Sequence, residues 1–254
     1  MDTTSTQILI LGASSDIGQA IMQGLAKLQG VSVLAVARRE NFAVPSVENF
    51  ATLGGIDLTE TPSLTRLSES AKDFFEDRPF SMIHCVGDFW IHKPLVATPI
   101  SEISRMLNSH VFTLMAAAHA LTPIMIENGG GRLIAFSCNS VGYNYPDMSP
   151  FTASKAAVES FVKCFSNEYA EFGISATALA LSTIRTPKVE IEKATGDLGN
   201  YVTPVELADY IIGTLLTQPK EVTGNVVKLF RYSRTFYHSS YYDRNPRRQS
   251  GNEP

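Results

Sequence analysis

The chain is poor in several features that define whole classes of protein. Its 254 residues include three cysteines, and no CxxC or Cys/His spacing relates them. An odd, sparse set of cysteines argues against a disulfide framework and against a zinc site. No apolar run approaches the roughly 20 residues that span a bilayer. The N-terminus has no basic stretch and no cleavage site, so we expect a soluble, cytoplasmic protein without a membrane partner.

Charge of either sign is also scarce. Charged residues make up 18% of the chain and sum to −4, which disfavours a nucleic-acid partner. The distribution is uneven, because residues 231–254 carry five arginines against one aspartate and one glutamate, together with four of the nine tyrosines. We expect this aromatic and basic tail to pack over a substrate cleft or a neighbouring subunit.

Apolar residues, 44% of the chain, form short runs that alternate with helical patterns. The runs are Gln7–Leu11, Val31–Ala37, Ser81–Val86, Arg132–Ser137, Ser175–Leu181 and Val226–Phe230. The helical patterns cover Ile17–Leu28, 61–75, 99–127, Phe151–Phe172 and 203–216. Apolar strands separated by helices predict a parallel sheet covered on both faces, with ligands beyond the carboxyl ends of the strands. Because no linker divides the pattern, we expect one domain over 1–230 and a tail over 231–254.

Two helix starts are marked by threonine and proline. Thr61 precedes Pro62, which predicts Thr61 as an N-cap. Thr203-Pro204-Val205-Glu206 fits a capping box, in which the side chains of the threonine and the glutamate bond each other's backbone amides.

A glycine turn, GASSDIG, joins the first apolar run to the first helix. Gly12 lets the chain turn tightly off the strand, and Gly18 lets the helix pack close to the sheet. Asp16 is placed to cap the helix, and free amides at the helix start can hold a pyrophosphate. The alternative is a plain strand–helix corner, but the context of strand, turn and helix favours a cofactor. The predicted cofactor-binding residues here are Gly12, Ser14, Ser15, Asp16, Ile17 and Gly18.

This turn resembles that of the short-chain dehydrogenase/reductase family, which typically shows T-G-x-x-x-G-x-G. Leu11 stands for the threonine and Asp16 for the middle glycine. The resemblance covers nearly all of residues 7–230. It implies a three-layer, doubly wound Rossmann fold with a mainly parallel seven-stranded sheet, and an oxidoreductase with a nicotinamide cofactor.

Further cofactor contacts follow from the same resemblance. Asp57 and Leu58 match the pair whose side chain and amide contact adenine. Gly87 is the surviving residue of an Asn-Asn-Ala-Gly motif. Ile184 and Thr186 lie in a segment that matches P-G-x-V-x-T-P, where the backbone and a hydroxyl hold the nicotinamide carboxamide.

Two arginines bear on the choice between NAD and NADP. An acidic residue at the end of the second strand would bond a ribose hydroxyl and favour NAD. This chain has Arg38 and Arg39 there instead, and two guanidiniums suit a 2′-phosphate. We therefore expect NADP(H) to be favoured over NAD(H), with a solvated surface pair as the alternative interpretation.

The catalytic positions depart from the family's pattern. In the family an Asn positions a water or a backbone group, a Ser bonds the substrate oxygen, a Tyr transfers the proton, and a Lys lowers the Tyr pKa and holds the ribose. Asn108 and Lys155 match two of these positions. Phe151 occupies the Tyr position, and Cys138, thirteen residues earlier, occupies the Ser position. Ser137 or Ser140 takes that place if the loop is shifted.

Three functions are compatible with this site, because phenylalanine cannot transfer a proton and a thiol is a weak hydrogen-bond donor. The first, which we favour, is a redox enzyme whose acid has moved to Tyr143 or Tyr145, on the loop before the Phe151 helix. The second is an NADP(H)-binding sensor or partner subunit without turnover. The third is an elimination or epimerisation that uses Lys155 or Cys138.

Other side chains suggest the substrate and the partners. Trp90, His92 and Lys93 follow the fourth strand, near the substrate mouth in this family, and fit a small polar or anionic metabolite. His84 and His110 fall on strand and helix patterns, where a structural role is expected. The helical patterns at 99–127 and 151–172 are apolar on more than one face, which together with the resemblance predicts a homodimer or homotetramer.

Overall fold

Seven parallel strands form one sheet in the computed structural model, which describes residues 6–88, 93–192 and 198–229. The strands are β1 (Thr6–Leu11), β2 (Val31–Val36), β3 (Phe50–Leu53), β4 (Phe80–His84), β5 (Gly131–Cys138), β6 (Ile174–Leu181) and β7 (Asn225–Leu229). Their order is β3-β2-β1-β4-β5-β6-β7, and each neighbouring pair is parallel. The predicted fold class is therefore confirmed, with the described strands entirely rather than mainly parallel.

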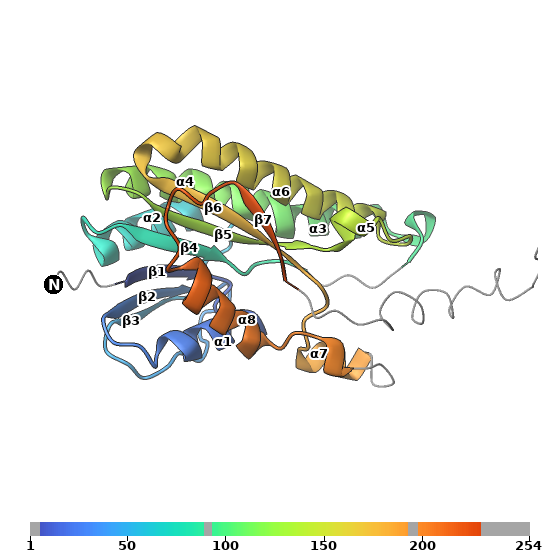
Figure 1. Cartoon of the computed structure of the whole chain (residues 1–254), viewed down its shortest axis with the longest axis horizontal. Helices are drawn as coiled ribbons and strands as arrows, with labels where there is room; N and C mark the ends of the chain where they lie inside the picture. The colour runs from blue at the N-terminus through green and yellow to red at the C-terminus, as the bar shows by residue number, and fades with distance from the viewer. Residues whose placement is uncertain (1–5, 89–92, 193–197, 230–254) are drawn as a thin grey trace, which may run out of the picture.

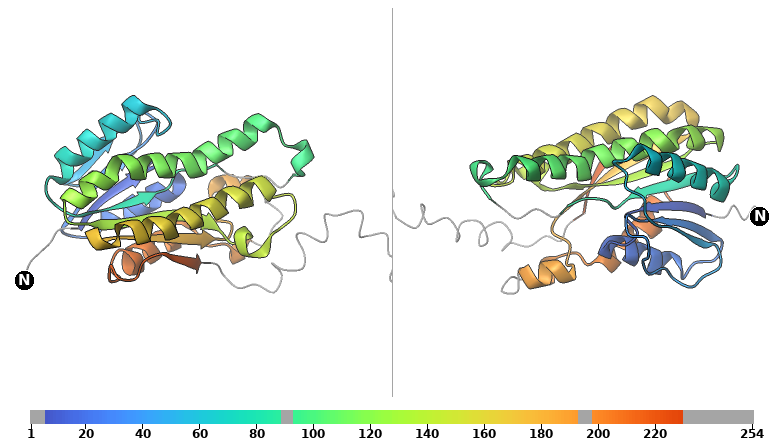
Figure 2. Two further views of the ribbon diagram at one scale, coloured as in Figure 1. Left: turned by 90° about the horizontal axis from the view of Figure 1, so that it is seen from above. Right: turned by 180° about the vertical axis from the view of Figure 1, so that it is seen from behind.

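Helices cover both faces of the sheet (Figures 1 and 2). They are α1 (Asp16–Leu25), α2 (Thr61–Phe75), α3 (Ile100–Leu107), α4 (Thr113–Glu127), α5 (Ser140–Tyr143), α6 (Ser149–Tyr169), α7 (Pro187–Glu192) and α8 (Pro204–Tyr210). On one face α2, α4 and α6 share a core with the sheet, and on the other α1 and α8 do so. The central strands are buried on both sides, which explains why they are continuous apolar runs.

Three elements differ from the sequence prediction. β3 was not recognised, because its four residues are only partly buried and carry no clear apolar pattern. The helix predicted over 99–127 is interrupted by a π-helical turn, η2 (Asn108–Phe112), between α3 and α4. Thr61 is not an N-cap, because it already lies in α2 and the cap position is Glu60. Proline is tolerated at either of the first two helical positions, so Pro62 did not fix the boundary.

The capping box at α8 is formed as the sequence predicts. The Thr203 hydroxyl accepts a hydrogen bond from the Glu206 amide at 3.2 Å, and the Glu206 carboxylate accepts one from the Thr203 amide at 2.9 Å. These bonds fix the start of a helix whose Leu207 and Ala208 pack against the sheet.

The helical run Ile100–Glu127 is long and apolar enough, by length and composition, to cross a membrane. In the fold, however, Leu114, Ala117, Leu121 and Met125 of this run are fully buried in the core shared with α2 and the sheet. Packing against the sheet therefore accounts for its apolar character. The predicted tail from residue 231 and the side chains of Trp90 and His92 lie outside the described residues.

Candidate active site

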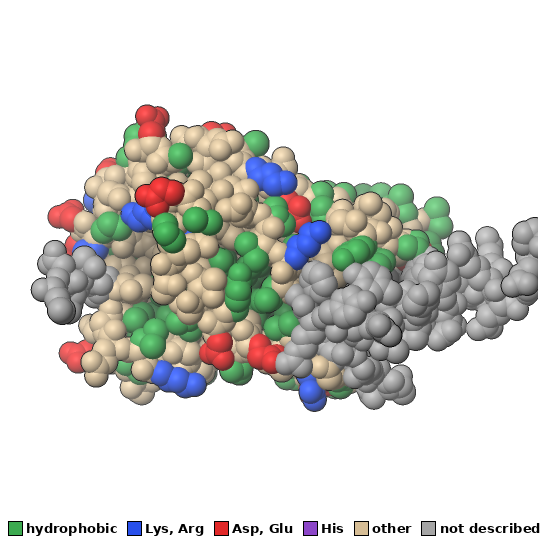
Figure 3. Space-filling model, viewed as in Figure 1, with side chains coloured by type: hydrophobic (Ala, Val, Ile, Leu, Met, Phe, Trp, Pro, Cys, Tyr) green, Lys and Arg blue, Asp and Glu red, His purple; other side chains and the backbone are tan. Residues whose placement is uncertain are grey.

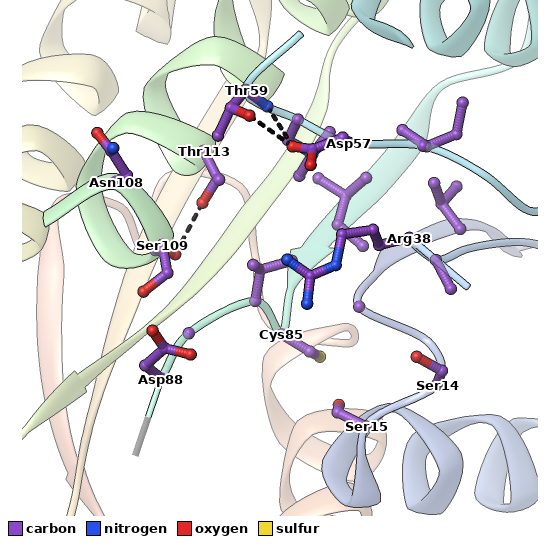
Figure 4. Close-up of a pocket in the computed structure, with 18 of the residues that line it drawn as sticks. Ser14, Ser15, Arg38, Asp57, Thr59, Cys85, Asp88, Asn108, Ser109 and Thr113 are labelled. Atoms are coloured by element: carbon purple, nitrogen blue, oxygen red, sulfur yellow. Dashed lines mark hydrogen bonds between the residues drawn. The ribbon is translucent and has the colours of Figure 1, made fainter. Parts of the chain in front are cut away.

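A cavity of about 830 Å³ lies at the carboxyl edge of the sheet, beside the boundary between β1 and β4 (Figure 4). The chain leaves these two strands in opposite directions across the sheet, so this is the switch point at which such folds bind ligands. The predicted cofactor and catalytic residues that line the cavity are Gly12, Ser14, Ser15, Arg38, Arg39, Asp57, Leu58, Gly87 and Asn108. Five segments that are separate in the sequence thus meet around one cavity.

The glycine turn has geometry that only glycine satisfies. Gly12 has a φ of 80°, and a side chain there would begin 3.0 Å from the backbone carbon of Cys85. A Cβ on Gly18 would lie 2.6 Å from the Gly12 carbonyl oxygen and 2.8 Å from the Cα of Ala13. Backbone atoms cannot move aside without a large energetic cost, so a residue with a side chain does not fit at either position.

The start of α1 is capped by Ser15 rather than by Asp16. The Ser15 hydroxyl accepts a hydrogen bond from the Gly18 amide at 3.1 Å. Asp16 is instead the exposed first residue of the helix, where its charge suits the helix dipole. The prediction that Asp16 caps the helix is therefore wrong; the shorter serine one position earlier reaches the amide. First-turn amides, including those of Asp16 and Ile17, have no intrahelical partner and can bind an anion.

Asp57 is held as a carboxylate at the rim of the cavity (Figure 4). Its Oδ1 accepts hydrogen bonds from the Thr59 hydroxyl at 2.6 Å and from the Thr59 amide at 2.9 Å. These bonds lower the pKa of Asp57, and the nearby Arg38 guanidinium lowers it further. Arg38 and Arg39 themselves are exposed and form no ion pair with another described residue.

These features fit a dinucleotide. The tight turn leaves no side chain between the backbone and a pyrophosphate, and the helix start supplies amides. The two arginines stand where β2 ends, and Asp57 and Leu58 follow β3 on the same wall. A nicotinamide dinucleotide therefore matches both the shape and the charge of this cavity.

Phe151 and Lys155, one turn apart on α6, lie beyond the cavity lining. The Lys155 ammonium donates to the Phe136 carbonyl oxygen at 3.0 Å and lies 5.7 Å from the centre of the Phe151 ring. Lys155 is 8% exposed. Burial lowers its pKa to about 8, an effect that Cys138 partly opposes.

His110 connects the end of β4 to α6 beside these residues. The Ser154 hydroxyl donates to the Phe151 carbonyl at 2.7 Å, so it accepts from His110 Nδ1 at 2.8 Å. His110 Nε2 lies 3.0 Å from the Asp88 amide nitrogen and 2.9 Å from the Asp88 carbonyl oxygen, and in the tautomer with its proton on Nδ1 it accepts from the amide. Burial, followed by the charge of Lys155, lowers the pKa of His110 to about 3. The structural role predicted for this histidine agrees with these bonds.

His84 is a second buried, neutral histidine. Its Nε2 lies 3.1 Å from the Thr113 hydroxyl, and burial, followed by the charge of Lys155, lowers its pKa to about 3. No pattern in the sequence indicates that either histidine faces Lys155. One local signal was available for His110, which lies two residues after the predicted catalytic residue Asn108.

The candidates for the serine position are now distinguishable by their contacts. The Ser137 hydroxyl donates to the Glu159 carboxylate at 2.6 Å, on the α6 side of the sheet. The Ser140 hydroxyl is fully buried, with no hydrogen-bond partner among the described residues. Cys138 is partly exposed, and its sulfur is 3.5 Å from the Ser140 amide. Of the three, the Cys138 side chain is the most accessible.

Tyr143 and Tyr145 form a stacked pair whose ring centres are 5.7 Å apart. Tyr145 packs with Phe151 against Met106 and Met148. Burial, followed by Tyr143, raises the pKa of Tyr145, which makes its hydroxyl a weaker acid. The loop thus approaches the α6 positions, as its place in the sequence suggested.

Several predicted residues do not line the cavity. Ile184 is buried and bridges to Val202, while the Thr186 hydroxyl accepts from the Val189 amide at 3.4 Å, at the start of α7. Both follow β6 at the carboxyl edge of the sheet. The others outside the lining are Asp16, Ile17, Gly18, Cys138, Tyr143, Tyr145, Phe151 and Lys155. Asn108 does line it, from a π-helical turn in which the Thr113 amide bonds the Asn108 carbonyl.

Comparison with known proteins agrees with this geometry. The family model for short chain dehydrogenase matches residues 6–195. A fatty acyl-CoA reductase of Acinetobacter baylyi is 28% identical over 233 residues, which cover 87% of this chain and 76% of that protein. A serine 3-dehydrogenase of Rhizobium radiobacter is 25% identical over 245 residues, which cover 91% and 96%.

Among solved structures, the 3-ketoacyl-(acyl-carrier-protein) reductase of Brucella melitensis, complexed with NADH, matches with a TM-score of 0.78 at 20% identity. The match covers 90% of this chain and 98% of that one, which shows a common fold. The fold and the family model together imply an oxidoreductase with a nicotinamide cofactor. This chain belongs to the short-chain dehydrogenase/reductase family.

Proposed function

We propose that this protein is an NADP(H)-dependent oxidoreductase that interconverts a carbonyl and an alcohol on a small polar metabolite. The observation that carries the proposal is the cavity, which brings the Gly12 turn, Arg38 and Arg39, Asp57, and Gly87 around a single space. A bound nicotinamide would supply or take up a hydride there. A cytoplasmic location stays a prediction.

The preference for NADP(H) rests on the arginine pair. Arg38 and Arg39 follow β2 and line the cavity wall. Neither guanidinium forms an ion pair with another described residue. Both can therefore donate charge-assisted hydrogen bonds to a 2′-phosphate at this wall. Such bonds contribute about 1.5–3 kcal/mol each, so losing the pair should weaken binding by about 100-fold or more.

Calorimetric titration of NADPH and NADH tests this preference. For the double variant Arg38→Ala, Arg39→Ala, we expect NADPH affinity to fall by about 100-fold or more and NADH affinity less than about threefold. Arg78→Ala is the matched control, because Arg78 lies between α2 and β4, at the opposite edge of the sheet. Equal losses for both cofactors would reject the assignment of the arginines.

The active site proposed here is non-standard. Phe151 stands at the position of the proton-transferring tyrosine, and Cys138 at the position of the serine. Because Ser137 is bonded to Glu159 and Ser140 is enclosed, Cys138 is the residue that meets the substrate oxygen. A thiol donates weakly, so we expect the remaining site to position the substrate more than to activate it.

We also propose that the protein is a homodimer or homotetramer that associates through the α4 and α6 faces. Four large apolar side chains on the α3–α4 run are exposed in a single chain: Ile100 by 79%, Leu107 by 41%, Phe112 by 48% and Met115 by 40%. A second copy would cover them. Nucleic acid is not the expected partner, because the face in Figure 3 shows basic side chains scattered among acidic ones. Light scattering of the wild type and of Phe112→Glu tests the interface, since the variant should shift toward the monomer.

A further inference from the structure

We propose that Lys155 is the proton donor of this site and gives its ammonium proton directly to the substrate oxygen when a carbonyl is reduced. The inference rests on the proposed oxidoreductase function and supplies the acid that Phe151 cannot. It also differs from the sequence-based hypothesis, which placed the acid on Tyr143 or Tyr145.

The ammonium lies next to the cavity, just outside its lining. Lys155 Nζ is 3.7 Å from the point where a side chain on Gly87 would begin, and the His110 ring is 3.0 Å from the same point. Because Gly87 lines the cavity and has no side chain, Nζ lies close behind the cavity wall at this residue. One of its N–H groups donates to the Phe136 carbonyl, which leaves two donors for a ligand.

Phe151 stands at the position of the family's tyrosine, so no hydroxyl at that position lies between the ammonium and a substrate. The centre of the Phe151 ring is 5.7 Å from Nζ, in the arrangement of a cation–π contact. The other edge of the ring meets His110 at a centroid distance of 5.4 Å. Phe151 thus shields the ammonium from water without competing for its proton.

Burial, rather than a neighbouring charge, favours proton release from Lys155, and Cys138 acts in the opposite direction. His84 on β4 and His110 on η2 are neutral, and Cys138 on β5 is the remaining partner. Burial lowers the pKa of Lys155 from 10.5 to about 8, so the ammonium still exceeds the amine by roughly tenfold at pH 7. Its proton is released roughly 300-fold more readily than that of an ordinary lysine.

The loop tyrosines are weaker candidates. Tyr145 packs against Met106, Met148 and Phe151, and its burial raises its pKa, so its proton is harder to release at neutral pH. Tyr143 is stacked on Tyr145 and 37% exposed.

The step balances in atoms and electrons. A reduced nicotinamide bound in the cavity would supply the hydride for the new C–H bond, and the π pair of the carbonyl would move to oxygen. That oxygen takes a proton from the Lys155 ammonium, which leaves an alcohol and a neutral amine. Water returns the proton to the amine before the next turnover, and alcohol oxidation is the reverse.

The first test measures Lys155 without turnover. In apo-protein labelled with ¹³C and ¹⁵N at lysine, NMR at the side-chain nitrogen follows its titration, with the signal assigned from its loss in Lys155→Met. We expect a midpoint near pH 8. A midpoint near the ordinary value of lysine would overturn the inference, whether or not a substrate is known.

The second test uses carbonyl reduction. Lys155→Ala should lower kcat by about 10²–10⁴-fold, and methylamine should restore part of it, because a small amine can enter the vacated space and donate. NADPH affinity, measured by calorimetry, separates this loss from a loss of cofactor binding. Tyr143→Phe and Tyr145→Phe should keep kcat within about threefold and retain the wild-type fall in kcat above pH 8.

Two outcomes separate this inference from the proposed function. If the wild type binds NADPH but reduces no carbonyl in a broad panel, the proposed function fails. If the wild type reduces carbonyls and Lys155→Ala does so at the same rate, or Tyr145→Phe abolishes turnover, the proposed function stands and Lys155 is not the donor.

Discussion

Mild acid should destabilise this protein through its two buried histidines. His84 is 2% exposed and His110 is 1% exposed, and both rings are neutral in the fold. Protonating either ring would place a second positive charge beside the Lys155 ammonium, away from water. The unfolded chain faces no such obstacle, so it binds protons at a higher pH than the native protein.

The sign and the size of the change in stability with pH follow from the histidine pKa values. Each histidine has a pKa of about 3 in the fold and about 6.5 in the unfolded chain, so between these values the unfolded state holds more protons. Stability is therefore complete above about pH 6.5 and falls as the pH drops toward 3. Each histidine contributes a slope of about 1.4 kcal/mol per pH unit in that window, or about 3 kcal/mol for the pair.

Urea unfolding at pH 7.5, 6, 5 and 4 measures this slope. The wild type should lose about 3 kcal/mol between pH 6 and pH 5, and His110→Gln should lose about half as much over the same interval. The variant should also be less stable at pH 7.5, by about 1–3 kcal/mol, because Ser154 and the Asp88 amide lose their partner. His119→Gln, which removes an exposed histidine of α4, is the control. Equal stability of the wild type at pH 7.5 and pH 5 would refute the assignment of neutral, buried rings.

Three other substitutions test separate parts of the account. In Gly18→Ala, the new Cβ would meet the Gly12 carbonyl oxygen at 2.6 Å. We therefore expect the free energy of unfolding, measured by denaturation, to fall by about 2 kcal/mol or more, and NADPH affinity, measured by calorimetry, to fall at least tenfold. Thr203→Ala should cost about 1 kcal/mol of stability and leave NADPH affinity unchanged, since it removes only the cap shared with Glu206. Phe151→Tyr should raise kcat for carbonyl reduction at least tenfold, because the new hydroxyl would be a second acid beside the ammonium; a lower kcat at unchanged NADPH affinity would count against the position assigned to residue 151.

Local signals in the sequence predicted most of the fold. Alternating apolar runs and helices indicated the parallel sheet, and the Thr203–Glu206 capping box was placed correctly because all its atoms come from four consecutive residues. β3 was missed because its stability comes from pairing with β2 rather than from a pattern of its own. The π-helical turn at Asn108–Phe112 has no sequence signal either, since glycine and proline are absent from it.

Part of the candidate site could likewise be predicted from local sequence, and part could not. The glycine turn was predictable because its constraints are largely local. A side chain on Gly18 would meet the backbone of Gly12 and Ala13, and Gly12 has a positive φ of its own. The environment of Lys155 was not, because it is built from Phe136, Gly87 and His110, which come from three other elements. The bonds of His110 to Asp88 and Ser154 likewise join segments far apart in the chain, so the sequence indicated only that the histidine is structural.

We propose that this site transfers a hydride with Phe151 at the position of the family's tyrosine. The most direct measurement incubates the protein with NADPH carrying deuterium at the transferable position and with a panel of small polar carbonyl compounds, and analyses the products by mass spectrometry. We predict deuterium on the carbinol carbon of at least one product, and less of it with the Gly18→Ala variant at an NADPH concentration that does not saturate that variant. Tight binding of NADPH without any deuterium in the products would contradict this proposal and would leave the protein a cofactor-binding sensor or partner subunit.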